Sequence, residues 1–354
     1  MPLFEGKRVL ITGGTGSLGK VLVHRLLSGE LGKPKKIIAF SRDEAKQHAM
    51  RVEYMHRGAV TDEVIYRNFE QLLEFRIGDV RDSHSMSAVL RDADIVLNAA
   101  ALKQVPTCEY FPFEAVQTNI HGPENIVRAI REHGLPVEVV VGVSTDKACK
   151  PVNVMGMTKA IQERVFIRGN LDCPHTRFVC VRYGNVLASR GSVIPLFHEQ
   201  IRSGGPVTIT TAEMTRFLLS LHQAVDIVFE ALRHAHRGET YVPQVPSAKV
   251  IDIATVLIGE RPIQTVFSGI RPGEKIHEIL VSEEEAHRTT DRGSYHVIWP
   301  ILPELRLAEH QGPALGREYT SADNLLSEEE VAALLQRHGL LSVDKTVFDG
   351  ELLR

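Results

Sequence analysis

The chain has 354 residues, of which 43% are hydrophobic and 24% are charged, and its formal net charge is -3. This near-neutral balance argues against binding of nucleic acid or of anionic membranes through bulk electrostatics, because both need clustered lysine and arginine. The four cysteines form no CxxC pair, and the N-terminal residues lack the features of a signal peptide. The longest apolar stretches fall well below the roughly 18 residues that cross a bilayer. We therefore expect a cytoplasmic protein with reduced thiols and no membrane anchor.

Short β-branched segments recur through the first half of the chain and predict buried strands. They begin at Arg8, Lys36, Leu73, Asp94, Val137 and Phe178. Helical patterns lie between several of them, for example over residues 113–133, where Pro112 suits the first turn and Gly134 suits the C-terminal cap. The connection 47–71 is long and predicts a helix of its own. Because strand and helix alternate, the sequence predicts an α/β fold with a Rossmann-type doubly wound parallel sheet.

The pattern becomes shorter and less regular after about residue 190, where SGGP, PQVPS, SGIRPGEK and IWPILP interrupt it. We therefore divide the chain into a Rossmann domain, residues 1–190, to which part of the later chain returns, and a smaller C-terminal substrate-binding region, residues 191–354. Within this region Ser327 and Glu330 form a capping box before a helix that Gly339 ends.

A glycine-rich loop, TGGTGSLG, follows the first strand directly and opens a helical run. Glycines at these spacings permit a tight turn, let backbone N–H groups approach a pyrophosphate, and let the helix pack closely on the strand. We predict that the following loop residues bind a dinucleotide: Gly13, Thr15, Gly16, Ser17, Leu18 and Gly19.

The end of the second strand predicts which dinucleotide is bound. Ser41 stands where NAD-binding domains place an acid on the ribose hydroxyls. A hydroxyl beside the guanidinium of Arg42 suits a 2′-phosphate, and Lys46 can add a second cation. The sequence therefore favours NADP, although Asp43 keeps NAD possible.

Polar residues also gather after the fifth strand, at Thr145, Asp146 and Lys147, and Met155 and Lys159 follow at the start of the next helix. Ligands of open parallel sheets bind at the carboxyl ends of the strands.

With its motifs TGGTGSLG, SRDEAK, GDVRD, NAAALK, STDK and RYGNV, the chain resembles the extended short-chain dehydrogenase/reductase family over roughly residues 5–285. STDK, RYGNVLASRGSVIPLF, MTRF and RPGEK are most similar to those of nucleotide-sugar 4,6-dehydratases that act on UDP-N-acetylglucosamine. The resemblance implies further cofactor contacts at Asp79, Val80, Ala99, Ala100, Ala101 and Tyr183.

This resemblance also implies a reaction. Hydride leaves C4 of the hexose for the nicotinamide, water is eliminated across C5 and C6, and the hydride returns to C6. Lys147 is implied as the base at C5 and Asp146 as the acid at the C6 hydroxyl. Met155 replaces the tyrosine of the family's YxxxK motif, and a thioether cannot take the C4 hydroxyl proton. We therefore expect Asp146 to take that proton, Thr145 to bind the sugar and Lys159 to hold the nicotinamide ribose.

A UDP-sugar needs cations at its diphosphate, and Arg216 and Arg271 supply forked donors that match phosphate. By resemblance, the other substrate residues are Asn185 at the diphosphate, Val193 and Pro195 at the uracil, Glu274 at the ribose, and Lys103 at the substrate or cofactor. His234 and His236 stand among basic residues at a helix end, so we expect no metal there.

The expected protein is thus a homo-oligomeric NADP-dependent lyase that makes surface-polysaccharide precursors, and inversion at C5 fits if Lys147 reprotonates the opposite face. Two alternatives remain open. A UDP-sugar 4-epimerase would use the ketone without elimination, and the Asp146–Lys147 pair disfavours it. A non-catalytic NADP-sensing module would need neither acid nor base at a sugar.

Overall fold

The computed structural model describes residues 2–57, 63–187, 192–308 and 314–341. Its main sheet has nine strands in the order β13-β14-β9-β6-β5-β4-β1-β2-β3. From β3 to β9 every neighbouring pair is parallel, and β14 and β13 add an antiparallel hairpin at one edge. The bounds are β1 Arg8–Thr12, β2 Lys36–Ser41, β3 Leu73–Ile77, β4 Ile95–Asn98, β5 Val139–Val143, β6 Arg177–Val181, β9 Thr240–Pro243, β13 Thr289–Arg292 and β14 Tyr295–Ile298. The predicted parallel sheet is confirmed.

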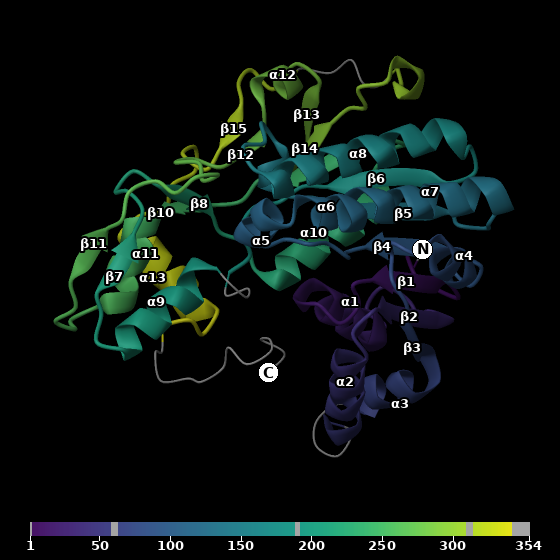
Figure 1. Ribbon diagram of the computed structural model, residues 1–354, viewed down its shortest axis with the longest axis horizontal. Helices are drawn as coiled ribbons and strands as arrows, with labels where there is room; N and C mark the ends of the chain where they lie inside the picture. The colour runs from purple at the N-terminus through teal and green to yellow at the C-terminus, as the bar shows by residue number, and fades with distance from the viewer. Residues whose placement is uncertain (1, 58–62, 188–191, 309–313, 342–354) are drawn as a thin grey trace.

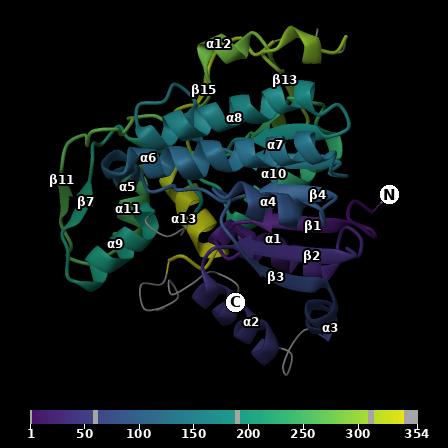
Figure 2. The ribbon, with the colours of Figure 1, turned by 45° about the vertical axis from the view of Figure 1, so that its right-hand side comes forward.

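Helices cover both faces of this sheet, as expected of a doubly wound fold (Figures 1 and 2). One face packs against α1 (Ser17–Ser28), α3 (Glu63–Leu72) and α10 (Leu221–His234), and α2 (Glu44–Arg57) lies beside α3. The other face packs against α4 (Ser83–Leu90), α7 (Gly122–His133) and α8 (Val154–Asp172). The central strands β1, β2, β4, β5 and β6 are largely buried, which explains their continuous apolar sequences, whereas the edge strand β3 is half-buried.

A smaller lobe with its own hydrophobic core lies beside the carboxyl ends of the strands (Figure 1). It contains α9 (Val193–Arg202), α11 (Val250–Ile258), α13 (Glu328–Arg337), β7 (Val207–Ile209), β8 (Thr215–Phe217), β10 (Ser247–Lys249) and β11 (Thr265–Phe267). The remaining elements are α5 (Val105–Tyr110), α6 (Pro112–Val116), α12 (Glu283–Ala286), β12 (Ile279–Val281) and β15 (Tyr319–Thr320). Strand β9, helix α10 and the β13–β14 hairpin return to the main sheet. The proposed domain boundary after residue 190 lies outside the described residues and stays a prediction.

Two predicted helices differ in detail from the structure. The pattern over 113–133 forms α6, a π-helical turn at Gln117–His121 and α7, although Pro112 and Gly134 stand at the ends as expected. Pro123 has no N–H to donate, which interrupts the α-helical ladder, and the buried Asn119 turns inward to bond the backbone of Leu102. The connection 47–71 carries parts of two helices, α2 and α3, rather than one.

The capping box before α13 is confirmed, with the Ser327 hydroxyl accepting from the Glu330 N–H and the Glu330 carboxylate accepting from the Ser327 N–H. Among the described residues, no helix combines the length and the apolar character that crossing a bilayer would require.

Candidate active site

A cavity of about 1120 Å³ lies between the carboxyl ends of the strands and the smaller lobe. Every site residue predicted from the sequence lines it, apart from Pro195, which lies in the first turn of α9 without reaching the cavity. The structure therefore brings together residues from position 13 to position 274. The cavity is also lined by residues that the sequence did not single out, including Ser144, Gly184, Thr210 and Glu278.

The glycine loop fits a pyrophosphate. A Cβ atom at Gly19 would lie 2.4 Å from the carbonyl oxygen of Gly13, so only glycine lets α1 begin against the loop. Gly16 is the N-cap of α1 and contributes no side-chain cap, which leaves the first N–H groups of the helix for an anion.

The polar side chains at the end of β2 make different contacts. The Ser41 hydroxyl accepts from the side-chain amide of Gln47 at 3.0 Å, which fixes its position at the cavity. The Arg42 side chain is 58% exposed, and its nearest carboxylate, on Asp79, lies 3.9 Å away. Asp43 instead accepts from the Lys46 N–H and pairs with Lys46 Nζ at 2.7 Å. The expected second cation is thus already paired with a carboxylate, whereas Arg42 is exposed and has the longer contact with Asp79.

The turn that carries the predicted catalytic residues follows β5. Thr145 caps a short 3-10 turn, Asp146–Ala148, and donates its hydroxyl proton to Asp146 Oδ1 at 2.8 Å. Lys147 Nζ donates to the same oxygen at 3.0 Å. Asp146 is 0% exposed, and its second oxygen, Oδ2, has no hydrogen-bond partner among the described residues. A Cβ at Gly156 would lie 2.1 Å from the Lys147 carbonyl oxygen, so α8 can begin this close only with glycine there.

A second carboxylate contacts Lys147. Glu278 Oε1 lies 3.2 Å from Lys147 Nζ and 3.7 Å from Arg216 Nε. Burial raises the pKa of Asp146, and the charge of Glu278 adds to this rise although Lys147 opposes it. Burial alone would lower the pKa of Lys147, but the charges of Asp146 and Glu278 outweigh it and raise that pKa. Lys147 is therefore an ammonium held between two carboxyl groups.

Met155 and Lys159 of α8, and Tyr183 after β6, line the same cavity. Lys159 Nζ donates to the Val143 carbonyl oxygen at 2.5 Å and to Gln162 Oε1 at 2.6 Å, which leaves one of its three N–H donors. Burial lowers the pKa of Lys159 to about 8. Met155 is 5% exposed, and burial raises the pKa of the Tyr183 hydroxyl. Both side chains are thus neutral at neutral pH, and Gln162 is a positioning residue that the sequence analysis missed.

The predicted substrate residues surround the other end of the cavity. Arg216 donates to the Thr215 and Ile276 carbonyl oxygens, at 2.7 and 3.1 Å. Glu274 accepts weakly from the Thr210 hydroxyl at 3.4 Å. The side-chain oxygen of Asn185 is buried without a partner in the described part of the chain, as expected of a group that a ligand would complete.

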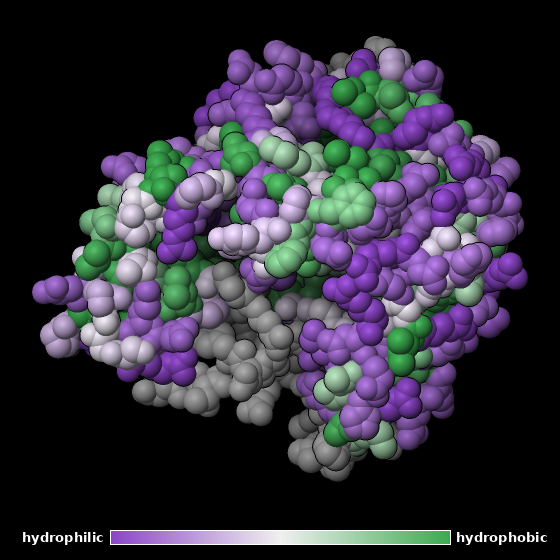
Figure 3. All heavy atoms as spheres, in the orientation of Figure 1, coloured by the Kyte–Doolittle hydropathy of each residue, from purple (hydrophilic) through white to green (hydrophobic). Residues whose placement is uncertain are grey.

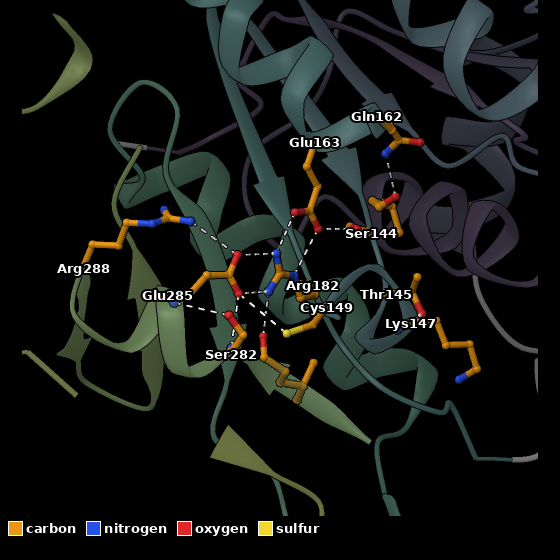
Figure 4. A network of polar contacts seen from close by, with 12 residues as sticks. Ser144, Thr145, Lys147, Cys149, Gln162, Glu163, Arg182, Ser282, Glu285 and Arg288 are labelled. Carbon is orange, nitrogen blue, oxygen red and sulfur yellow. Dashed lines mark hydrogen bonds and ion pairs between the residues drawn. The ribbon is translucent and has the colours of Figure 1, made fainter. Parts of the chain in front are cut away.

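A buried ion-pair network lies beside the turn that carries the predicted catalytic residues (Figure 4). Arg182 follows β6 and bridges Glu163 of α8 and Glu285 of α12, with its closest contacts at 2.6 and 2.7 Å. Glu163 also accepts from the Ser144 hydroxyl at 2.5 Å. Ser144 immediately precedes Thr145, so this network fixes the backbone from which Thr145 and Lys147 project.

Comparisons with known proteins agree with this geometry. Residues 9–300 match the model of the polysaccharide biosynthesis protein family. The chain is 42% identical over 303 residues to a UDP-N-acetylglucosamine 4,6-dehydratase (inverting) of Campylobacter jejuni, covering 85% of each chain. It is also 42% identical over 344 residues to a UDP-glucose 4-epimerase of Rickettsia bellii, covering 94% of this chain and 96% of the relative. The two relatives carry different activity names at equal identity, so similarity alone does not choose between them.

A solved structure gives the same result for the fold. The X-ray structure of Pen from Bacillus thuringiensis matches with a TM-score of 0.84 and 34% identity, over 96% of this chain and 99% of that one. The match spans the main sheet and the smaller lobe together. The chain therefore belongs to the polysaccharide biosynthesis protein family and is an extended short-chain dehydrogenase/reductase.

Proposed function

We propose that this chain is a cytoplasmic UDP-N-acetylglucosamine 4,6-dehydratase with NADP as its bound cofactor. The observation that carries the proposal is the Asp146–Lys147 pair, which lines the cavity with one Asp146 oxygen left without a partner. Elimination of water needs an acid and a base beside the same sugar. Epimerisation at C4 needs no acid at the C6 hydroxyl, so the pair favours the dehydratase over the epimerase.

The cofactor would be held by this chain's own groups. The loop at Gly13–Gly19 would bind the pyrophosphate, and the remaining N–H donor of Lys159 would bind the nicotinamide ribose. Ser41 and Arg42 would bind a 2′-phosphate. The pairing of Asp43 with Lys46 supports NADP, because the acid that would select NAD is engaged elsewhere. When bound, the nicotinamide supplies the hydride acceptor for C4 and the hydride donor for C6.

Asp146 and Lys147, in the turn after β5, would then move the protons. Asp146 Oδ2 would take the C4 hydroxyl proton, and its raised pKa makes it a better base than an exposed aspartate. The same proton would then leave with the C6 hydroxyl as water. Lys147 would act at C5, and inversion follows if it returns a proton to the opposite face. Met155 would only pack beside the sugar.

The nucleotide would lie along the other half of the cavity. Arg216, Arg271 and Asn185 would bind the diphosphate, while Glu274 would bind the ribose and Val193 the uracil. Lys103 would contact the sugar or the cofactor. Pro195 is left out of this proposal because it does not line the cavity.

Product analysis tests the proposed function. Purified protein incubated with UDP-N-acetylglucosamine should give a product lighter by one water in mass spectrometry, with no net reduced cofactor. NMR of that product reports the configuration at C5. Recovery of UDP-N-acetylgalactosamine alone would establish the epimerase instead. Failure to turn over any UDP-hexose, with NADP still bound, would establish the sensing module.

We also propose a homo-oligomer formed through an exposed apolar face on α5, α6, α8 and their connections (Figure 3). This face contains Tyr110, Phe111, Phe113, Val152, Met157 and Ile161, each at least 46% exposed. A second copy of the chain presenting the same face would cover it with like residues. Light scattering should report a smaller particle for Phe113→Asp than for the unaltered chain, and equal masses would contradict this interface.

A further inference from the structure

Glu278 occupies an unusual position for a carboxylate. It precedes β12, is 3% exposed and lines the cavity beside Lys147. Its backbone is fixed by Ser321, since the Glu278 N–H donates to Ser321 Oγ at 2.9 Å and the Ser321 N–H donates to the Glu278 carbonyl at 2.8 Å. Its Oε2 atom is buried without a hydrogen-bond partner in the described structure. Such an atom is costly to bury and points to a role in the chemistry.

The proposed dehydration moves protons in an order that requires such a role. Asp146 must take the C4 hydroxyl proton, and Lys147 must take the C5 proton before any proton leaves with water. The two carboxyl groups in contact with Lys147 raise its pKa, however, so Lys147 is an ammonium, and an ammonium cannot accept a proton. A group beside Lys147 must therefore first take a proton from it.

Among the charged groups that the structure describes around the Lys147 ammonium, one remains that can accept its proton. Asp146 and Glu278 contact Lys147 directly, at 3.0 and 3.2 Å. Arg216 and Lys275 also face Glu278, but both are cations and accept nothing. Asp146 is committed to the C4 hydroxyl proton, and Glu278 remains.

We propose that Glu278 accepts one proton from the Lys147 ammonium and thereby frees the amine to act at C5. One N–H bond of Lys147 breaks and one O–H bond forms on Glu278. The amine takes the C5 proton, later returns a proton to C5, and recovers its own from Glu278, so no outside reactant is needed. The inference rests on the proposed dehydration. Glu278 acts through Lys147 and is a positioning residue, whereas Asp146 and Lys147 touch the sugar.

Two events of turnover would drive this transfer. Burial opposes ionisation of Glu278, but Lys147 and Arg216 lower its pKa, so the proton rests on Lys147 before turnover. Protonation of Asp146 at the oxidation step removes the negative charge that raises the Lys147 pKa. A bound sugar also displaces water, which favours a neutral amine and a neutral acid over an ion pair. The base would thus form only after C4 has been oxidised.

Glu278→Gln tests the proposal in single turnover with UDP-N-acetylglucosamine. Reduced nicotinamide should form as in the unaltered enzyme, while loss of water should slow by about 100-fold near neutral pH, within the range that a general base contributes. The loss should be recovered as the pH rises, because solvent then removes the Lys147 proton directly. Glu278→Asp keeps a carboxylate and should keep the pH profile of the unaltered enzyme. Glu318→Gln alters a surface pair with Lys150 and should change nothing.

Several results would overturn the inference. Unaltered loss of water in Glu278→Gln would show that no proton passes to Glu278, and a loss without recovery at high pH would reduce Glu278 to a structural residue. If the unaltered enzyme does not dehydrate the sugar, the proposed function fails and the inference fails with it. If the unaltered enzyme and Glu278→Gln dehydrate the sugar at equal rates, the inference is wrong while the proposed function stands.

A second measurement uses the unaltered enzyme, so it tests the inference even when the Glu278→Gln chain does not fold. UDP-6-deoxy-N-acetylglucosamine can be oxidised at C4 but has no C6 hydroxyl to lose. Infrared difference spectra of the unaltered enzyme with this compound should show two newly protonated carboxyl groups. A single protonated carboxyl group would contradict the transfer to Glu278.

Discussion

The buried pair between Arg182 and Glu285 gives a quantitative prediction about stability. Arg182 is 2% exposed, and two of its nitrogens donate to the two oxygens of Glu285 at 2.7 and 3.0 Å. Burial alone would raise the pKa of Glu285, but the charge of Arg182 and its hydrogen bonds lower that pKa from 4.5 to about 2. A carboxylate whose pKa falls on folding stabilises the fold wherever it is ionised in both states.

The magnitude follows from the two pKa values. A fall from 4.5 to about 2 corresponds to about 3 kcal/mol of folding free energy. This stabilisation is complete above pH 4.5 and is lost as the pH falls toward 2, because the unfolded chain binds the proton first. Glu285→Gln leaves Arg182 with the single carboxylate of Glu163. We expect this variant to lose about 3 to 5 kcal/mol at neutral pH.

Urea unfolding at a series of pH values measures this loss. The difference in unfolding free energy between the unaltered chain and Glu285→Gln should be constant from pH 7 to pH 5 and should shrink at lower pH. Glu318→Gln is the matched control, because its ion pair with Lys150 at 2.9 Å is on the surface and should contribute under about 1 kcal/mol. A Glu285→Gln variant within 1 kcal/mol of the unaltered chain, or a difference that does not change with pH, would refute the reasoning.

Other variants test the proposed site. Arg42→Ala should weaken NADP binding about tenfold or more while NAD binding changes little, because only NADP carries the 2′-phosphate; titration of both cofactors decides it. Asp146→Asn should abolish formation of reduced nicotinamide, whereas Lys147→Ala should allow its transient formation without loss of water, as single-turnover absorbance would show. Met155→Ala should lose less than about tenfold in dehydration rate, since its thioether moves no proton. Reduced nicotinamide forming at the unaltered rate in Asp146→Asn would assign the C4 base to water or Lys159.

Much of the sheet could be predicted from local sequence because its central strands, β1, β2, β4, β5 and β6, are largely buried on both faces. Each of the six predicted segments coincides with a strand, and their starts agree within two residues. Strands such as β9 and β14 escaped prediction for a physical reason. They have four residues each, and their pairing with each other joins segments far apart in the chain.

The site itself was predictable where a motif specifies backbone geometry. The glycine loop and the start of α8 need glycines at fixed places, and these residues bring Thr145, Asp146 and Lys159 to one cavity. The pairing of Lys46 with Asp43 was not predictable, because a motif gives the residue types but not which of two nearby charges a flexible side chain will meet.

Glu278 is a residue whose proposed role in the mechanism could not be predicted from a motif. It stands four residues after Glu274 in RPGEKIHE, so an acid close to a substrate motif was the one signal available in the sequence. Its contact with Lys147 spans 131 positions and depends on the segment before β12 packing against the turn after β5. Motifs alone present Lys147 as a ready base, whereas the structure places it between two carboxyl groups whose charges raise its pKa. A lysine base therefore has to be considered together with the group that would remove its proton, and the group proposed here comes from a segment far away in the chain.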